Sequence, residues 1–141
     1  MNLYSKMLNI QNIDTEDLIK SAISEVKNEL QGLSPERMCF VFSSYLYNAL
    51  LKRHLLVHIV DTHDLGTSYQ HRFVIVYNGI NYYLCDLTYS MFQNSLFPEL
   101  LSNGYMKCDS NSLKSYLEII TREDVDLSID EVFNTNNNLG R

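Results

Sequence analysis

The chain of 141 residues has only three cysteines and no long apolar run. An odd number of cysteines argues against a closed disulfide framework, so we expect a free thiol and action in a reducing cytoplasm. No segment approaches the roughly 18 apolar residues that cross a bilayer, and the first residues lack the apolar core of a signal peptide. Specialised secretion routes use no such signal, so delivery as an effector or toxin domain stays open.

Positive charge is also scarce. Eleven lysines and arginines face 17 acidic residues, giving a net charge of −6 and a pI of about 5.1. This balance excludes a nucleic-acid backbone as a natural partner, and no basic amphipathic face suggests a membrane surface. The apolar fraction is ordinary for a globular protein. We expect a single domain over residues 1–133 and a disordered, asparagine-rich tail over residues 134–141.

Two helices are predicted in the first part of the chain. Residues 14–31 carry apolar side chains at spacings of three and four, with Asp14 or Thr15 as the cap. Ser34 and the proline that follows it suit the start of a second helix, expected over Pro35–Lys52. Because that helix is apolar on most sides, it should be central to the fold.

Strand-forming residues dominate the middle of the chain. Strands are expected at 55–62, 71–77, 80–86 and 104–108, and short helices at 113–121 and 125–133. Asn78-Gly79 predicts a two-residue hairpin turn, and the segment Leu87–Asn103 is expected to be a loop that packs apolar side chains. The predicted fold class is α+β, with a central helix packed on an antiparallel sheet of three to five strands.

Cys39, His71 and Asp86 form the candidate catalytic set. Cys39 falls in the first turns of the second helix, where the helix dipole favours a thiolate. A two-residue turn at Asn78-Gly79 would place His71 opposite Asp86 on neighbouring strands, within reach of an imidazole–carboxylate hydrogen bond. A cysteine nucleophile needs a histidine for proton transfer and a third group to orient that histidine. The same residues can also be read as a core cysteine and a surface ion pair.

Other residues with metal-binding or redox chemistry form no recognisable pattern. His54, His58 and His63 lack the spacing of a zinc site, so we expect neither a metal nor another cofactor. Cys85 and Cys108 are expected in the core, and nothing supports a disulfide between them. Tyr69 and Tyr89 lie near the candidate site along the chain, and we consider them as sides of a substrate groove.

Several short segments between residues 33 and 92 resemble those of known hydrolases. They are Glu36-Arg37-Met38-Cys39, Ser43-Ser44, Leu46–Leu51, His71-Arg72-Phe73-Val74 and Tyr83-Leu84-Cys85-Asp86-Leu87-Thr88-Tyr89, followed by Phe92. This set resembles the papain-like and transglutaminase-like cysteine hydrolases, most of all the compact papain-fold toxin and deamidase effector domains of bacteria. In those families a buried helix presents the cysteine, and an antiparallel sheet carries the histidine and aspartate.

The resemblance implies a catalytic triad with one departure from the family pattern. Cys39 would be the nucleophile, His71 the general base and then acid, and Asp86 the residue that orients the imidazole. Papain-type enzymes often carry an oxyanion-hole glutamine six residues before the cysteine, but Leu33 stands there and Gln31 is out of register. The oxyanion would therefore depend on the backbone N–H of Cys39 and a second, unassigned donor. Tryptophan, common in transglutaminases, is absent.

The expected reaction is thiolate attack on a carboxamide or peptide carbonyl of a protein substrate. Water then completes deamidation or proteolysis, or an amine completes transglutamination. The resemblance to toxin domains implies a cognate immunity or inhibitor protein as a further partner. Two alternatives stay open: a non-catalytic binding module of the immunity or adaptor type, and an arylamine-type acyltransferase that uses the same triad with an acyl thioester.

Overall fold

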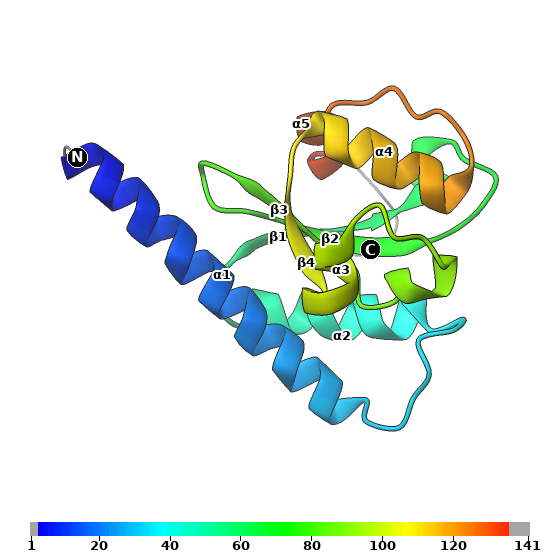
Figure 1. The fold of residues 1–141 in the computed structure, drawn as a ribbon, viewed down its shortest axis with the longest axis horizontal. Helices are drawn as coiled ribbons and strands as arrows, with labels where there is room; N and C mark the ends of the chain where they lie inside the picture. The colour runs from blue at the N-terminus through cyan, green and yellow to red at the C-terminus, as the bar shows by residue number, and fades with distance from the viewer. Residues whose placement is uncertain (1–2, 136–141) are drawn as a thin grey trace.

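A four-stranded antiparallel sheet in the order β1-β2-β3-β4 forms the centre of the computed structural model, which describes residues 3–135 (Figure 1). The strands are β1 (Leu56–Asp61), β2 (Arg72–Tyr77), β3 (Tyr82–Cys85) and β4 (Tyr105–Cys108). The helices are α1 (Leu3–Glu29), α2 (Cys39–Leu51), α3 (Pro98–Asn103), α4 (Ser110–Thr121) and α5 (Ile129–Phe133), with short 3-10 helices at Thr62–Leu65 and Tyr89–Phe92. The predicted α+β class and antiparallel sheet are confirmed.

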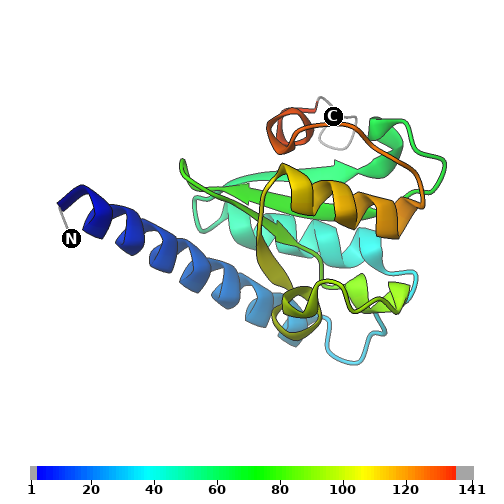
Figure 2. The same cartoon turned by 45° about the horizontal axis from the view of Figure 1, so that its top comes forward.

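Helices cover both faces of the sheet, and alternation along the strands supplies both halves of the core. On β2, Val74 and Val76 pack with the buried faces of α1 and α2. Phe73 and Ile75, their neighbours, point the other way and pack with α4 and α5. The α2 and α4 helices accordingly lie on opposite sides of the sheet (Figure 2).

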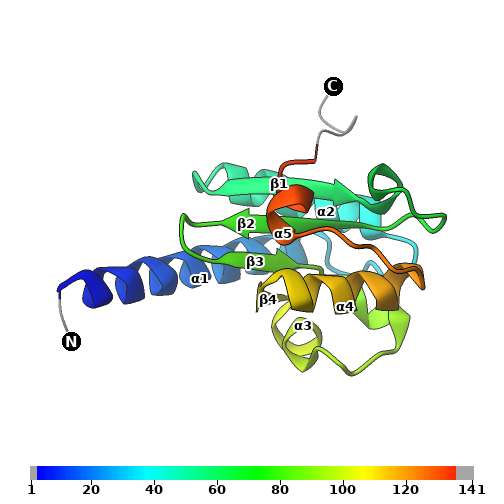
Figure 3. The ribbon, with the colours of Figure 1, turned by 90° about the horizontal axis from the view of Figure 1, so that it is seen from above.

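The first helix begins well before its predicted start near Asp14. It runs from Leu3 to Glu29, and its N-terminal half projects beyond the sheet (Figure 3). Thr15, a predicted cap, instead donates its hydroxyl to the backbone carbonyl of Gln11 at 2.8 Å, a bond to the preceding turn that is compatible with the helix interior. No glycine or proline interrupts the segment, so nothing local ends the helix earlier.

The second helix begins at Cys39, so the predicted start at Pro35 is wrong. Arg37 has a left-handed backbone with φ of 60°, which no α-helix accommodates. The Ser34 hydroxyl accepts from the Glu36 N–H at 3.3 Å, a local turn rather than a helix cap. Because of this turn, Cys39 becomes the first helical residue instead of lying in the second turn.

The β2–β3 hairpin is joined by four residues, so the predicted two-residue turn is wrong. Tyr77 pairs with Tyr82, and the carboxamide oxygen of Asn78 accepts from the N–H groups of Ile80 and Asn81 at 2.9 and 2.8 Å. Continued outward, this register places Phe73, not His71, opposite Asp86. A change of partner by two positions preserves the face on which a side chain lies, so His71 and Asp86 still share one face.

The C-terminal third contains more regular structure than predicted. The segment expected to be a loop holds a 3-10 helix and α3, which has proline in its first turn. Asp109 caps α4, which therefore begins at Ser110, three residues before the predicted start at Leu113. Asn134 and Thr135 are hydrogen-bonded to the end of α5, and the other residues of the predicted tail, 136–141, lie outside the described part of the chain. Among residues 3–135, no helix has the length and apolar character needed to cross a membrane.

Gly104, between α3 and β4, offers a direct test of the close packing against Leu87. It has φ of 82°, and a Cβ there would lie 2.6 Å from Leu87 Cδ2. We expect Gly104→Ala to lower the free energy of unfolding by about 2–4 kcal/mol, combining left-handed strain with overpacking. Gly32→Ala is the matched control, because its φ is 90° but no atom lies within 4 Å. It should cost only about 1–2 kcal/mol in urea unfolding, and equal losses would contradict the packing argument.

Candidate active site

The structure brings Cys39, His71 and Asp86 together at one end of the sheet. Cys39 is the first residue of α2, His71 directly precedes β2, and Asp86 directly follows β3. His71 Nε2 lies 2.9 Å from Asp86 Oδ2, and the His71 side chain also interacts with the Cys39 thiol. All three predicted site residues therefore meet, although the histidine and aspartate are diagonal neighbours across the hairpin rather than direct partners.

The imidazole of His71 has one ring nitrogen committed and one left over. The side chain is fully buried, and Nε2 is bonded to Asp86. Among the described residues, Nδ1 has no hydrogen-bond partner of standard geometry. A buried polar atom of this kind needs an explanation. Because Nε2 is hydrogen-bonded to Asp86, Nδ1 is the nitrogen available to the Cys39 thiol and to a ligand.

Electrostatics favour the charged forms of both Cys39 and His71. Burial lowers the pKa of His71, but Asp86 and the Cys39 thiol outweigh it and raise the pKa to about 9. Burial raises the pKa of the Cys39 thiol. The His71 side chain and the backbone N–H of Arg72 lower it by more, so the pKa lies below its usual value. The site thus favours thiolate and imidazolium together, which is the reactive form of a cysteine nucleophile.

Asp86 is buried and makes four hydrogen bonds. Oδ2 accepts from His71 and from the Tyr116 hydroxyl at 2.5 Å, and Oδ1 accepts from the Thr88 N–H and hydroxyl, both at 2.9 Å. Burial raises the pKa of Asp86, but His71, Tyr116 and the Thr88 N–H together hold it below its usual value. The carboxylate is therefore ionised and fixed in direction. Sequence reasoning missed Tyr116, because its place in the apolar stripe of α4 indicates only a core aromatic.

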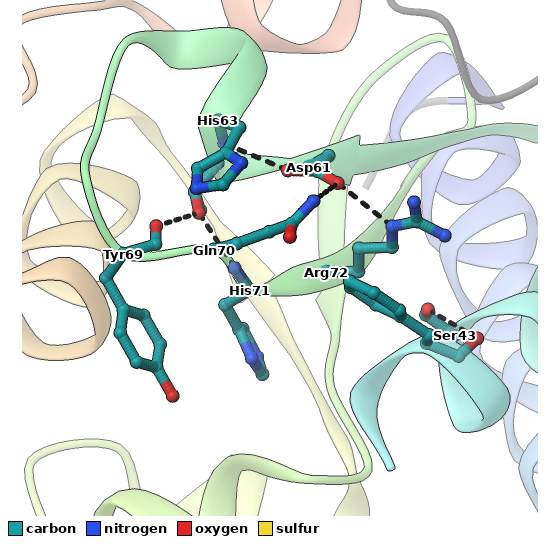
Figure 4. A network of polar contacts seen from close by, with 9 residues as sticks. Ser43, Asp61, His63, Tyr69, Gln70, His71 and Arg72 are labelled. Atoms are coloured by element: carbon teal, nitrogen blue, oxygen red, sulfur yellow. Dashed lines mark hydrogen bonds and ion pairs between the residues drawn. The ribbon is translucent and has the colours of Figure 1, made fainter. Parts of the chain in front are cut away.

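Thr62 fixes the backbone of His71. Its N–H donates to the His71 carbonyl at 3.0 Å, and its hydroxyl oxygen accepts from the His71 N–H at 2.9 Å. The same hydroxyl donates to the carbonyl of Tyr69 at 2.7 Å (Figure 4). The buried side chain of Thr62 therefore holds both ends of the segment 69–71 that precedes β2. The loop at residues 66–68 is anchored to the same residue, because the Thr67 hydroxyl donates to the Thr62 carbonyl at 2.9 Å.

Arg72 connects the histidine strand to the cysteine helix. Its Nε donates to Asp61 Oδ2 at 3.0 Å, and Gln70 donates to the same oxygen at 2.6 Å (Figure 4). The guanidinium carbon of Arg72 lies 3.9 Å from the ring centroid of Phe40, a cation–π contact with the residue next to Cys39. This chain of contacts holds β1, β2 and the first turn of α2 in one arrangement and so sets the position of Cys39 relative to His71.

Aromatic rings shield the imidazole on its other side. The Phe92 ring meets the His71 ring edge to face at 4.9 Å between centroids, and Tyr69 meets Phe92 at 6.2 Å. Tyr69 is exposed and borders a groove beyond Phe92. Tyr89 is buried against Phe97 and Tyr116, so the expectation that it lines a groove is wrong.

A crevice beside Cys39 is too narrow to admit water. It is lined by Cys39, Ser43, Asp86 and Thr88 among others. The partly exposed thiol is therefore accessible only from the surface, and the side chains of His71 and Asp86 are buried behind it. Exclusion of water strengthens the electrostatic interactions within the triad.

The remaining cysteines are chemically different from Cys39. Cys85 and Cys108 are both buried and free, in agreement with the expected core positions. Burial raises the pKa of the Cys85 thiol strongly and that of Cys108 to about 12, so neither is a nucleophile near neutral pH. Within residues 3–135, no group of three or more histidine, cysteine or acidic side chains is arranged to hold a metal ion.

The start of α2 leaves backbone N–H groups for an oxyanion. The residue before Cys39 makes no side-chain cap bond, and the first N–H groups of a helix have no partner within the helix. Leu33, which stands at the usual position of an oxyanion-hole glutamine, and Gln31, two residues before it, are both exposed. The N–H of Cys39 is the donor that this geometry makes available.

The charge on His71 predicts a specific pH dependence of stability. Its pKa rises from 6.5 to about 9 on folding, so its stabilising contribution is complete below about pH 6.5 and disappears as the pH passes 9. We expect Asp86→Asn to lower the free energy of unfolding, and the deficit relative to wild type to shrink by about 2–3 kcal/mol between pH 6 and 9.5.

Urea unfolding at a series of pH values measures this deficit. Asp124→Asn is the matched control, since it makes the same change at a largely exposed ion pair with Lys114. That variant should show no comparable pH-dependent change. A deficit for Asp86→Asn that stays constant across the range would contradict a charged His71.

Comparison with known proteins identifies no relative of this chain. No family model matches it, and neither the curated proteins nor the solved structures contain a significant match.

Proposed function

We propose that this protein is a cysteine-dependent hydrolase that acts on a carboxamide or peptide bond of a protein through Cys39, His71 and Asp86. The observation that carries the proposal is a buried imidazole bonded to an ionised carboxylate on Nε2, with Nδ1 left for a thiol whose pKa is lowered. Perturbed titratable groups that act on one another at one place are typical of catalytic sites.

The geometry supports a two-step acyl transfer. The Cys39 sulfur attacks the carbonyl carbon, and the charge that forms on the oxygen is stabilised by the N–H of Cys39 at the start of α2. The His71 imidazolium gives its proton from Nδ1 to the leaving amine or ammonia as the carbon–nitrogen bond breaks. A thioester on Cys39 and a neutral imidazole remain.

Water resolves the thioester in the second step. Neutral His71 takes a proton from water, whose oxygen attacks the thioester carbonyl and expels the Cys39 thiolate. Asp86 stays ionised throughout, because its four hydrogen bonds and its interaction with His71 keep its pKa low. Its role is to orient the imidazole and stabilise its charged form.

The biological setting of the proposal comes from the resemblance alone. Likeness to papain-fold toxin and deamidase effector domains suggests hydrolysis of a glutamine side chain or a peptide bond in a host or competitor protein. Action in a reducing cytoplasm agrees with three free thiols. A cognate immunity or inhibitor protein would then protect the producing cell.

Transfer to an amine is the second candidate function, and the same triad favours it. An acyl-enzyme on Cys39 partitions between water and any amine that reaches the thioester, giving transglutamination or arylamine-type acyl transfer. A binding module that merely retains these residues is less favoured, because burying an ion pair costs several kcal/mol of desolvation that packing of apolar side chains would avoid.

Reaction products separate these functions. We expect a blocked glutaminyl peptide to release ammonia with the wild type, and Cys39→Ala and His71→Ala to lose at least about a thousandfold of that rate. Mass spectrometry of the peptide identifies deamidation, cleavage or, with a primary amine added, an amine adduct. An acyl thioester serves as a second donor for the acyltransferase function. Turnover that survives Cys39→Ala with any donor would contradict the proposal.

A further inference from the structure

A groove of about 490 Å³ lies directly beyond the aromatic cover of the histidine. It is lined by Tyr69, Met91, Phe92, Gln93 and the α4 residues Ile119–Thr121, with Arg122 at its end. Small-molecule and side-chain sites commonly fall between about 300 and 1,000 Å³, so the groove has room for part of a substrate. Phe92 joins it to the candidate active site, because the ring also contacts His71.

The groove and the candidate active site adjoin each other at Phe92, which lines the groove and contacts His71. Figure 4 shows His71 between Tyr69 on one side and the end of α2 that carries Ser43 on the other. The Tyr69 and His71 side chains point in the same direction from the segment before β2 (Figure 4). A chain bound with its carbonyl at Cys39 would reach the groove at the side that Tyr69 and Phe92 line.

The lining combines apolar sides with two polar residues in unusual backbone conformations. Met91, Phe92 and Ile119 supply apolar surface. Gln93 and Arg122 each end a helix with a left-handed backbone, at φ of 51° and 59°, and both are exposed. Non-glycine residues in this region carry strain that is often found at ligand sites. These two chain reversals bring a carboxamide and a guanidinium to the same groove.

Arg122 gives the groove a charge preference. Within residues 3–135, its side chain forms no ion pair, while the neighbouring Glu123 is held by the N–H of Ser68 at 2.7 Å. The chain as a whole carries a net charge of −6, and the Arg122 guanidinium places a positive charge beside this apolar groove. A guanidinium matches the geometry of a carboxylate.

We propose that this groove binds the substrate segment beyond the reactive carbonyl, with an apolar side chain on Met91, Phe92 and Ile119 and a carboxylate on Arg122. This inference rests on the proposed function and names its specificity. The preferred substrate would be a peptide segment with an aromatic or aliphatic residue followed by an acidic group.

Alkylation of Cys39 by tailed electrophiles tests the inference. Iodoacetamide, which has no tail, reports thiolate reactivity alone. Chloroacetyl-Phe-Glu-amide adds the proposed apolar and acidic groups, and chloroacetyl-Phe-Gln-amide is its neutral match. Chloroacetyl-Phe-Gln with a free terminal carboxylate distinguishes a chain terminus from an acidic side chain. Chloroacetyl-Gly-Gln-amide lacks the apolar group.

Relative rates at Cys39, read by mass spectrometry, give the expected result. The phenylalanine probes should react at least about fivefold faster than the glycine probe, and Met91→Ser should reduce this gain. Of the two probes that carry a carboxylate, the one that places it nearer Arg122 should react about two- to fivefold faster than the neutral chloroacetyl-Phe-Gln-amide. This gain should be lost in Arg122→Gln and restored in Arg122→Lys. Lys20→Gln, which removes the same charge from an exposed site on α1, should change nothing.

The outcomes separate the inference from the proposed function. An ordinary iodoacetamide rate at Cys39 would overturn the function, and a fast iodoacetamide rate with equal rates for all chloroacetyl probes would overturn only the groove. In a second experiment, acetyl-Phe-Glu-amide is added to the Cys39→Ser variant, and the change in NMR chemical shift of each residue is measured. Shifts at Ile119 and Arg122 support the groove, and shifts elsewhere or none contradict it.

Discussion

The buried ion pair between His71 and Asp86 is the interaction on which the rest of the site depends. Two charges taken out of water cost more than their attraction returns unless further hydrogen bonds satisfy them. Asp86 meets this condition through Tyr116 and Thr88, and Thr62 satisfies the backbone of His71. Among the buried side-chain atoms of residues 3–135, Nδ1 of His71 alone lacks a partner of standard geometry, and it is the ring nitrogen left for the Cys39 thiol.

The fold supplies each component from a different element and then ties those elements together. Figure 1 shows α2 and α4 on either side of the sheet; the first provides Cys39 and the second provides Tyr116. Arg72 joins β2 to Asp61 on β1 and to Phe40 on α2. Because these contacts are independent of the three site residues, they hold Cys39 and His71 in position without a ligand, which is the preorganisation that the proposed function needs.

The sequence predicted the triad and its shared sheet face, because both depend on alternation along strands. Asn78-Gly79 suggested a two-residue turn, whereas the Asn78 carboxamide organises a four-residue turn through bonds that also reach Asn12 and Thr15 on α1. The resulting register differs by two positions, so the histidine and aspartate kept the same face and stayed within reach across a diagonal. An error of one position would have placed them on opposite faces.

Other features were beyond sequence reasoning because they depend on tertiary contacts. The start of α2 at Cys39 follows from the left-handed Arg37, and no local signal predicts that conformation for arginine. Tyr116 and Phe92 look like ordinary core aromatics in the sequence, yet one bonds Asp86 and the other covers His71. The groove arises where the ends of two helices, distant in the chain, meet at Gln93 and Arg122.

The rate of iodoacetamide alkylation at each cysteine, followed against pH by mass spectrometry, tests the central claim most directly. Thiolate at Cys39 predicts fast reaction with an apparent pKa below the free value of about 8.5. Cys85 and Cys108 should stay unmodified in the folded protein, and His71→Ala should slow Cys39 at neutral pH. Protection of Cys39, or ordinary thiol behaviour that His71→Ala leaves unchanged, would contradict the account of this site as a cysteine hydrolase.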